Sequence, residues 1–143
     1  MMNAEKEAII LFGHGSRIPG AGEGMEQVAA RMREKLPREI IEICYMSRLG
    51  RHFPEVFESC VARGATKIIV MPYFLHTGLH LIEDIPELLR DKAAKYPHVK
   101  LVLGKNLGFD ECIVDLVIKR LVESKDLPDI REQKPPTDSP DGG

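Results

Sequence analysis

Tryptophan is absent from this sequence, and aromatic residues make up only 6% of its 143 residues. Hydrophobic residues still account for 43%, which is enough for a core in one domain of ordinary size, so we expect that core to be mainly aliphatic. The sequence also lacks an excess of either charge, because its net charge is −2. Since nucleic-acid binders usually carry a strong basic excess, this balance argues against a nucleic-acid partner.

Long apolar runs and paired cysteines are missing as well. No stretch approaches the roughly 20 apolar residues that cross a bilayer, and residues 1–7 contain no apolar run of the kind found in signal peptides. The three cysteines, Cys44, Cys60 and Cys112, form no CxxC pair, which is typical of reduced thiols in a cytosolic protein. We therefore expect a cytoplasmic protein without a membrane partner.

Short apolar runs alternate with segments of helical periodicity along the chain. The runs at 8–12, 40–46, 67–71 and 99–103 have the length and composition of buried strands, and the segments 22–36, 54–63, 81–96 and 113–121 repeat apolar residues at helical spacing. No hairpin signal joins two runs, so the helices are expected to serve as crossovers between parallel strands. The sequence predicts an α/β fold: a doubly wound, four-stranded parallel sheet with helices on both faces.

The composition changes after residue 124. Residues 125–143 mix charged residues with four prolines and end in two glycines. Such a segment buries too little apolar surface to offset the entropy of ordering it. We expect one domain over residues 1–124 and a disordered tail over residues 125–143.

The segment Gly13-His14-Gly15-Ser16-Arg17 directly follows the first expected strand. Ligands of open parallel sheets bind beyond the carboxyl ends of the strands, and the two glycines allow a sharp turn that exposes His14. The segment is not a dinucleotide fingerprint, because Ile18 stands where the third glycine of GxGxxG belongs, and it lacks the GK[ST] of a P-loop. A histidine phosphatase would have arginine at the position of Gly13. A plain strand-to-helix turn with a solvated histidine is the remaining alternative.

A second unusual segment, PYFLHTGLHLIEDIP over residues 72–86, follows the third expected strand. His76 and His80 are four residues apart, a spacing that allows two imidazoles to share a metal on one helical face, although Gly78 interrupts the segment. Either histidine alone is equally consistent with a packed or a surface position. Strands one and three are commonly near neighbours in doubly wound sheets, so we expect His14 and His80 to face one cavity.

These two segments, together with Ala-Arg-Gly-Ala at 62–65, resemble the short form of the class II metal chelatases. That family comprises the CbiX-type sirohydrochlorin cobaltochelatases and their sirohydrochlorin ferrochelatase relatives. The resemblance extends from Ala8 to about Glu123, and the pattern P-x-F-L-x-x-G-x-H-x-x-x-D-I-P from Pro72 to Pro86 is its most specific part. It implies a chelatase-like half-domain over residues 1–124.

The resemblance implies that His14 and His80 are the catalytic and metal-binding residues. Some relatives add a glutamate after the second strand, but this sequence has Ser47 there, so the third ligand stays open and His76 is a further candidate. The substrate would carry eight carboxylates, for which arginines, N–H donors and an apolar wall are suitable partners. Ordinary surface charge and core packing are the alternatives for these residues. The expected substrate-binding residues are Gly15, Ser16, Arg17, Arg48, Arg51, Phe74, Leu75 and Gly78.

The implied reaction is the insertion of a divalent metal into sirohydrochlorin or a similar tetrapyrrole. A free-base tetrapyrrole must lose two pyrrole protons as the metal enters, and a neutral imidazole both accepts a proton near pH 7 and coordinates first-row metals. Cobalt is the first choice of metal, with iron and nickel as alternatives, since imidazole suits all three. The metal is a substrate, and no organic cofactor is expected.

Long members of this class contain two similar halves that face one cleft. This chain supplies one half, so we expect a homodimer with a two-fold interface. A non-catalytic carrier of metal or tetrapyrrole is the alternative function, because it would use the same histidines.

Overall fold

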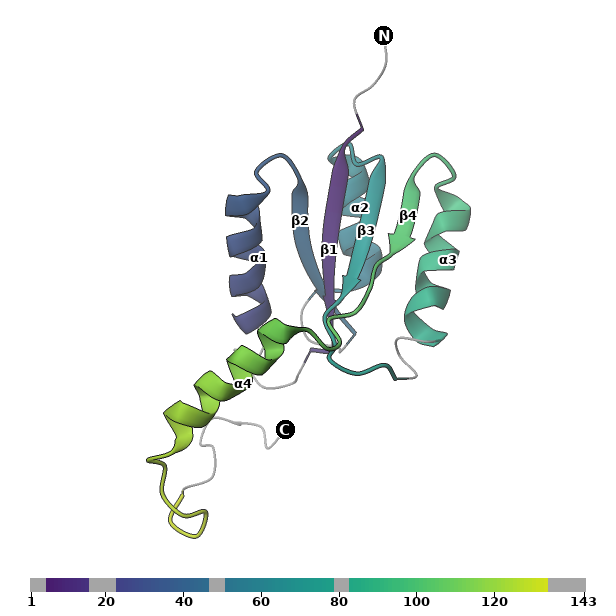
Figure 1. Cartoon of the computed structure of the whole chain (residues 1–143). Helices are drawn as coiled ribbons and strands as arrows, with labels where there is room; N and C mark the ends of the chain where they lie inside the picture. Colours follow the sequence, from purple (N-terminus) through teal and green to yellow (C-terminus); the bar gives the residue numbers. More distant parts are fainter. Residues whose placement is uncertain (1–4, 16–22, 47–50, 79–82, 134–143) are drawn as a thin grey trace.

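The computed structural model describes residues 5–15, 23–46, 51–78 and 83–133. Strands β1 (Glu7–Gly13), β2 (Ile40–Tyr45), β3 (Lys67–Pro72) and β4 (Lys100–Leu103) form one parallel sheet in the order β2-β1-β3-β4 (Figure 1). Helices α1 (Glu23–Lys35), α2 (Phe53–Ala62), α3 (Ile85–Lys95) and α4 (Glu111–Ser124) alternate with the strands. The predicted α/β fold is confirmed, and the predicted closeness of strands one and three is confirmed by their direct pairing.

Helices cover both faces of the sheet. One face packs on α2 and α3, where Ile10 of β1 and Ile68 of β3 are fully buried against Phe57 and Leu89. The other face packs on α1, where Leu11 and Ile41 contact Met25 and Ala29. Because consecutive strand residues point to opposite faces, the continuous apolar runs seen in the sequence serve both layers.

Aliphatic side chains predominate in the core, as expected, and the few aromatic ones gather on the α2 face. The ring centroids of Phe12 and Phe53 lie 5.9 Å apart, and those of Phe53 and Phe57 lie 5.7 Å apart. Tyr96, at the end of α3, places its ring edge-on to Phe57 at 5.1 Å. These contacts fasten α2 and α3 to the centre of the sheet.

Local signals set the ends of the helices. Pro54 lies in the first turn of α2, where its missing N–H costs nothing, and Gly64 follows the helix with a φ of +96°. Asp110 precedes α4, and its carboxylate accepts a hydrogen bond of 3.0 Å from the backbone N–H of Cys112. The bounds of α2 agree with the predicted segment 54–63 to within one residue, whereas α4 begins two residues before and ends three residues after the predicted segment 113–121.

Helix α4 differs from the other helices because it extends away from the sheet (Figure 1). None of its side chains is buried. Residues 125–133 continue as exposed turns, whereas residues 134–143 lie outside the described part of the chain, so the expected disorder of the tail stays a prediction. Within the described ranges, no helix is both long and apolar enough to span a lipid bilayer.

Candidate functional site

The loops after β1, β2 and β3 meet at the carboxyl edge of the sheet. The backbone N–H of Tyr73 donates to the carbonyl of Phe12 at 2.8 Å, and that of Met46 donates to the carbonyl of Gly13 at 3.0 Å. The three chain segments that leave these strands are therefore held side by side. This arrangement places residues distant in sequence around one rim, as ligand sites of open parallel sheets require.

His14 stands at this rim because the glycines on either side of it allow the backbone to turn there. A Cβ atom at Gly13 would lie 2.9 Å from Sδ of Met25, so the close approach of α1 favours glycine. Gly15 has a φ of +84°, which side chains of L-residues rarely adopt. The side chain of His14 is exposed, so its imidazole is accessible from the rim.

Phe74 joins the loop after β3 to His14. The ring of Phe74 is half-buried on the α2-face core, and its centroid lies 6.4 Å from that of His14 with the planes at 76°. The carbonyl of Phe74 also accepts hydrogen bonds from the N–H groups of Leu107 at 3.1 Å and Gly108 at 3.4 Å. Phe74 thus links the β1 loop, the β3 loop and the segment that leads into α4.

The remaining predicted site residues fall into two groups. Leu75, His76 and Gly78 are described and exposed in the loop after β3, and a Cβ at Gly78 would meet open space. Among the described residues, no three His, Cys, Asp or Glu side chains are grouped to hold a metal ion. Outside the described residues lie the other predicted site residues, Ser16, Arg17, Arg48 and His80, and also Ser47, which was not predicted as a ligand.

Arg51 points away from the rim and pairs with a carboxylate of β2. Its Nη1 lies 2.8 Å from Oε1 of Glu42, and Nη1 of Arg63 lies 2.8 Å from Oε2 of the same carboxylate. Although burial raises the pKa of Glu42, the hydrogen bonds from Arg63 and Arg51 outweigh it and hold that pKa below its ordinary value.

An acidic hollow of about 280 Å³ opens next to Met46, the residue that follows β2. Leu88 forms part of its wall, and its polar lining consists of three carboxyl-bearing residues: Asp84, directly before α3, and Glu87 and Asp91 within that helix. Carboxylates attract a divalent cation and repel a polyanion. The hollow is therefore unsuited to the carboxylate arms of a tetrapyrrole.

Comparison with known proteins places this geometry in a family. The family model CbiX matches residues 8–124, which covers all four helices and, except for Glu7 at the start of β1, all four strands. The chain belongs to the CbiX family. The sequence resemblance seen in the two histidine segments is thereby confirmed.

CbiX relatives occur both at the length of this chain and at about twice that length. A sirohydrochlorin cobaltochelatase of Methanococcoides burtonii is 34% identical, with 84% of this chain and 98% of the relative aligned. A sirohydrochlorin ferrochelatase of Priestia megaterium is also 34% identical, but 82% of this chain covers only 44% of it. The sirohydrochlorin chelatase SirB of Bacillus subtilis subspecies spizizenii, crystallised with cobalt, superimposes with a TM-score of 0.77 at 33% identity, over 82% of this chain and 50% of SirB. The chain thus spans half or less of the longer relatives.

Two features of this CbiX chain were not predicted from its sequence. The pairing of Arg51 with Glu42 was not foreseen, because strand patterns do not indicate which loop arginine folds back along the sheet edge. The hydrogen bonds from Leu107 and Gly108 to Phe74 were also missed, although the glycine at 108, with a φ of +55°, is a signal for a tight turn at that point.

Proposed function

We propose that this chain inserts a divalent metal ion, cobalt in the first place, into a sirohydrochlorin-type tetrapyrrole. The observation that carries the proposal is the contact between His14 and Phe74, which brings the β1 loop to the loop that leads to His80. Relatives named sirohydrochlorin cobaltochelatase, ferrochelatase or chelatase support the same reaction. This chain covers about half of the length of some of them and nearly the whole length of others. Iron and nickel are the alternative metals, because imidazole ligands suit all three.

In the proposed mechanism, His14 and His80 hold the metal loosely and take up the pyrrole protons. Neutral imidazole performs both tasks near pH 7, and a site with few protein ligands releases its ion to the four ring nitrogens. His76 is an additional candidate ligand because it is exposed in the same loop as His80.

The proposed substrate-binding surface surrounds His14. Gly15, Ser16 and Arg17 continue the β1 loop, Arg48 and Arg51 belong to the β2 loop, and Phe74, Leu75 and Gly78 to the β3 loop. Arginines form bidentate hydrogen bonds with carboxylates, while the exposed Leu75 and the ring of Phe74 offer apolar contact to the macrocycle. No organic cofactor is needed for this reaction.

We further propose a cytoplasmic homodimer. The free thiols of Cys44, Cys60 and Cys112 support a reducing compartment. A second copy would supply the half of the cleft that longer relatives contain within one chain, since this chain covers 44% of the Priestia protein.

An insertion assay separates the proposed chelatase from a carrier of metal or tetrapyrrole. Sirohydrochlorin and Co²⁺ are mixed with the chain at about one twentieth of the tetrapyrrole concentration, and the change in the visible spectrum is followed. A chelatase converts many equivalents per chain at a rate above that without protein. Conversion that stops at one equivalent, or proceeds at the uncatalysed rate, would contradict the proposal. Repeating the assay with Fe²⁺ and Ni²⁺ ranks the metals.

A further inference from the structure

A fourth segment of the chain joins the rim that carries His14. It comprises residues 104–110 between β4 and α4, and we call it the β4 loop. In Figure 1 the β4 loop runs from the edge strand past the end of β3 to the start of α4. The N–H groups of Leu107 and Gly108 donate to the carbonyl of Phe74 at 3.1 and 3.4 Å. These hydrogen bonds hold the β4 loop against the loop after β3.

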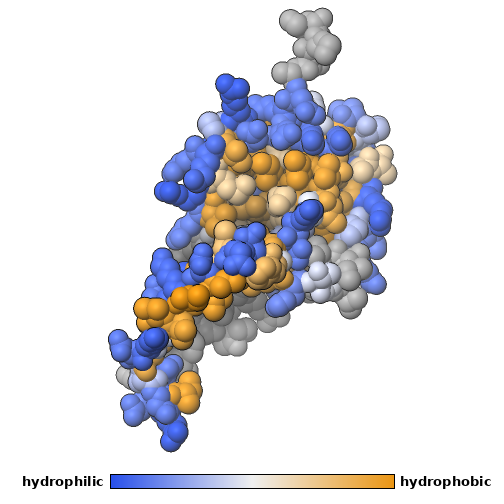
Figure 2. Space-filling model, in the orientation of Figure 1, coloured by the Kyte–Doolittle hydropathy of each residue, from blue (hydrophilic) through white to orange (hydrophobic). Residues whose placement is uncertain are grey.

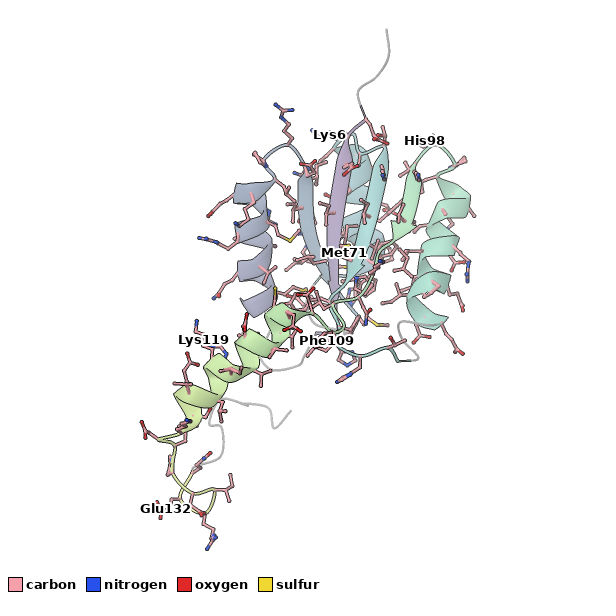
Figure 3. The ribbon with its side chains drawn as sticks, viewed as in Figure 1. Lys6, Met71, His98, Phe109, Lys119 and Glu132 are labelled. Carbon is pink, nitrogen blue, oxygen red and sulfur yellow. The ribbon has the colours of Figure 1, made fainter. Side chains whose placement is uncertain are left out.

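The β4 loop ends in an aromatic side chain that the described residues leave open. Phe109 is 77% exposed, which is the largest exposed fraction of any large hydrophobic side chain among the described residues. A residue directly before an N-cap often packs on the fourth residue of its helix, here Val114, but this exposure leaves most of the ring accessible. Figure 2 shows apolar side chains exposed where α4 joins the sheet, and Figure 3 places Phe109 at this junction. The ring is therefore available to a ligand at the rim.

The same loop carries a cation that is not engaged elsewhere. Lys105 is exposed, and within the described part of the chain its ammonium group takes part in no ion pair. Arg51, by contrast, is already paired with the carboxylate of Glu42. The acidic neighbour Asp110 turns its carboxylate to the backbone N–H of Cys112 at 3.0 Å. The β4 loop thus offers a ring and a positive charge together.

These two groups provide the contacts that a planar ligand with carboxylate arms requires. Aromatic rings attract other planar π-systems, and an ammonium group pairs with a carboxylate. Ligand sites are lined mainly by apolar and aromatic side chains with a few polar groups. The β4 loop is also continuous with the candidate site, because Phe74 contacts His14 through its ring and the β4 loop through its carbonyl.

We infer that Phe109 and Lys105 are further substrate-binding residues of this site. Phe109 stacks against the tetrapyrrole macrocycle, and Lys105 pairs with one of its carboxylate arms. The inference rests on the proposed function and adds a wall on the β4 side to the site around His14. Neither side chain binds the metal or accepts a pyrrole proton. Both therefore act on the affinity for the tetrapyrrole and not on the rate of the bound complex.

Steady-state cobalt insertion at varied sirohydrochlorin concentration tests this division. F109A should raise KM about 2- to 10-fold and K105Q about 2- to 5-fold, both with kcat unchanged. The conservative variants F109Y and K105R should restore the wild-type KM, because they keep the ring and the charge. The matched controls are I130A, which removes a side chain that is 75% exposed beyond α4, and K35Q, which removes an exposed charge at the end of α1. Both controls should match the wild type.

Binding of the tetrapyrrole without metal gives a readout that does not depend on turnover. The fluorescence anisotropy of metal-free sirohydrochlorin is followed as each protein is added. F109A and K105Q should raise Kd by the same factors by which they raise KM. Added salt should weaken binding to the wild type more than binding to K105Q, because it screens the pairing of Lys105 with a carboxylate.

The inference and the proposed function fail in different ways. If the wild type inserts cobalt and folded F109A and K105Q keep its KM and Kd, the role of the β4 loop is wrong while the chelatase stands. A loss of kcat at constant KM would also overturn that role. If F109A elutes from a sizing column at a lower mass than the wild type, a second copy covers the ring, and the inference is wrong. A wild type that neither binds sirohydrochlorin nor inserts metal would overturn both.

Discussion

The three cysteine side chains occupy environments that differ enough to be separated by their reactivity. Burial raises the pKa of Cys44 to about 12 and that of Cys60 to about 11, so both are protonated thiols without access to solvent. Cys112 is exposed, and the carboxylate of Asp110 beside it raises the pKa of its thiol. We therefore expect a thiol reagent to label one cysteine per folded chain, more slowly than a free thiol, and all three after unfolding.

The matched control is C112S, which should take up no label until it unfolds. Mass spectrometry of the labelled chain assigns the position. Labelling of Cys44 or Cys60 in the folded chain would contradict the packing described for α2 and β2.

Glu42 makes stability depend on pH. Its folded pKa lies below the ordinary value of 4.5 because Arg63 and Arg51 hydrogen-bond to the carboxylate despite its burial. A carboxyl group whose pKa is lower in the folded than in the unfolded state stabilises the fold at pH values above its ordinary pKa. This stabilisation is lost as the pH falls through the folded pKa. Glu42→Gln should reduce the free energy of unfolding by about 1–2 kcal/mol at pH 7, after allowing for the exposure of both arginines.

Urea unfolding of wild type and Glu42→Gln between pH 3 and pH 7 measures this contribution. The difference between the two should shrink as the pH drops below about 4.5. Glu34→Gln is the control, since Glu34 is exposed and lies 3.6 Å from an equally exposed Arg31. A difference that is constant over this range would show that the carboxylate charge is not the stabilising feature.

Among the secondary-structure elements, the glycine that follows β4 and the glycine at the start of α1 differ in the space available for a Cβ atom. A Cβ at Gly104 would lie 2.6 Å from Sδ of Met71 and 3.2 Å from the carbonyl oxygen of Val70, while a Cβ at Gly24 in α1 meets nothing within 4 Å. Gly104→Ala should therefore cost about 1–2 kcal/mol of stability. Gly24→Ala should gain about 0.5 kcal/mol, because alanine loses less backbone entropy in a helix. Thermal unfolding of both variants checks the two opposite signs.

The order and type of the elements could be predicted from the sequence because each buried strand is a short apolar run and each crossover helix has a periodic face. The position of α4 could not be predicted in this way. The period of Val114, Val117 and Leu121 indicates that one side of the helix is apolar, but it does not indicate which surface covers that side. The alternation of strands likewise predicts that the loops of β1 and β3 are neighbours, whereas the turn of Arg51 toward Glu42 depends on side-chain packing that periodicity does not encode.

At the scale of the whole molecule, the chain is a CbiX half-domain in which His14 stands exposed at the carboxyl rim of the sheet. The central proposal is that His14 and His80, which are far apart in sequence, act together on one metal ion at this rim. His98 serves as the control, because it lies before β4 at the amino end of the sheet with Lys6 (Figure 3).

The most direct test of that claim is the steady-state rate of cobalt insertion by His14→Ala, His80→Ala and His98→Ala, with circular dichroism to confirm that each variant is folded. Loss of a proton acceptor that also binds the metal should reduce turnover about 100-fold or more, so the first two variants should each be severely impaired, and His98→Ala should match the wild type. Turnover near the wild-type rate in folded His14→Ala or folded His80→Ala would contradict the account.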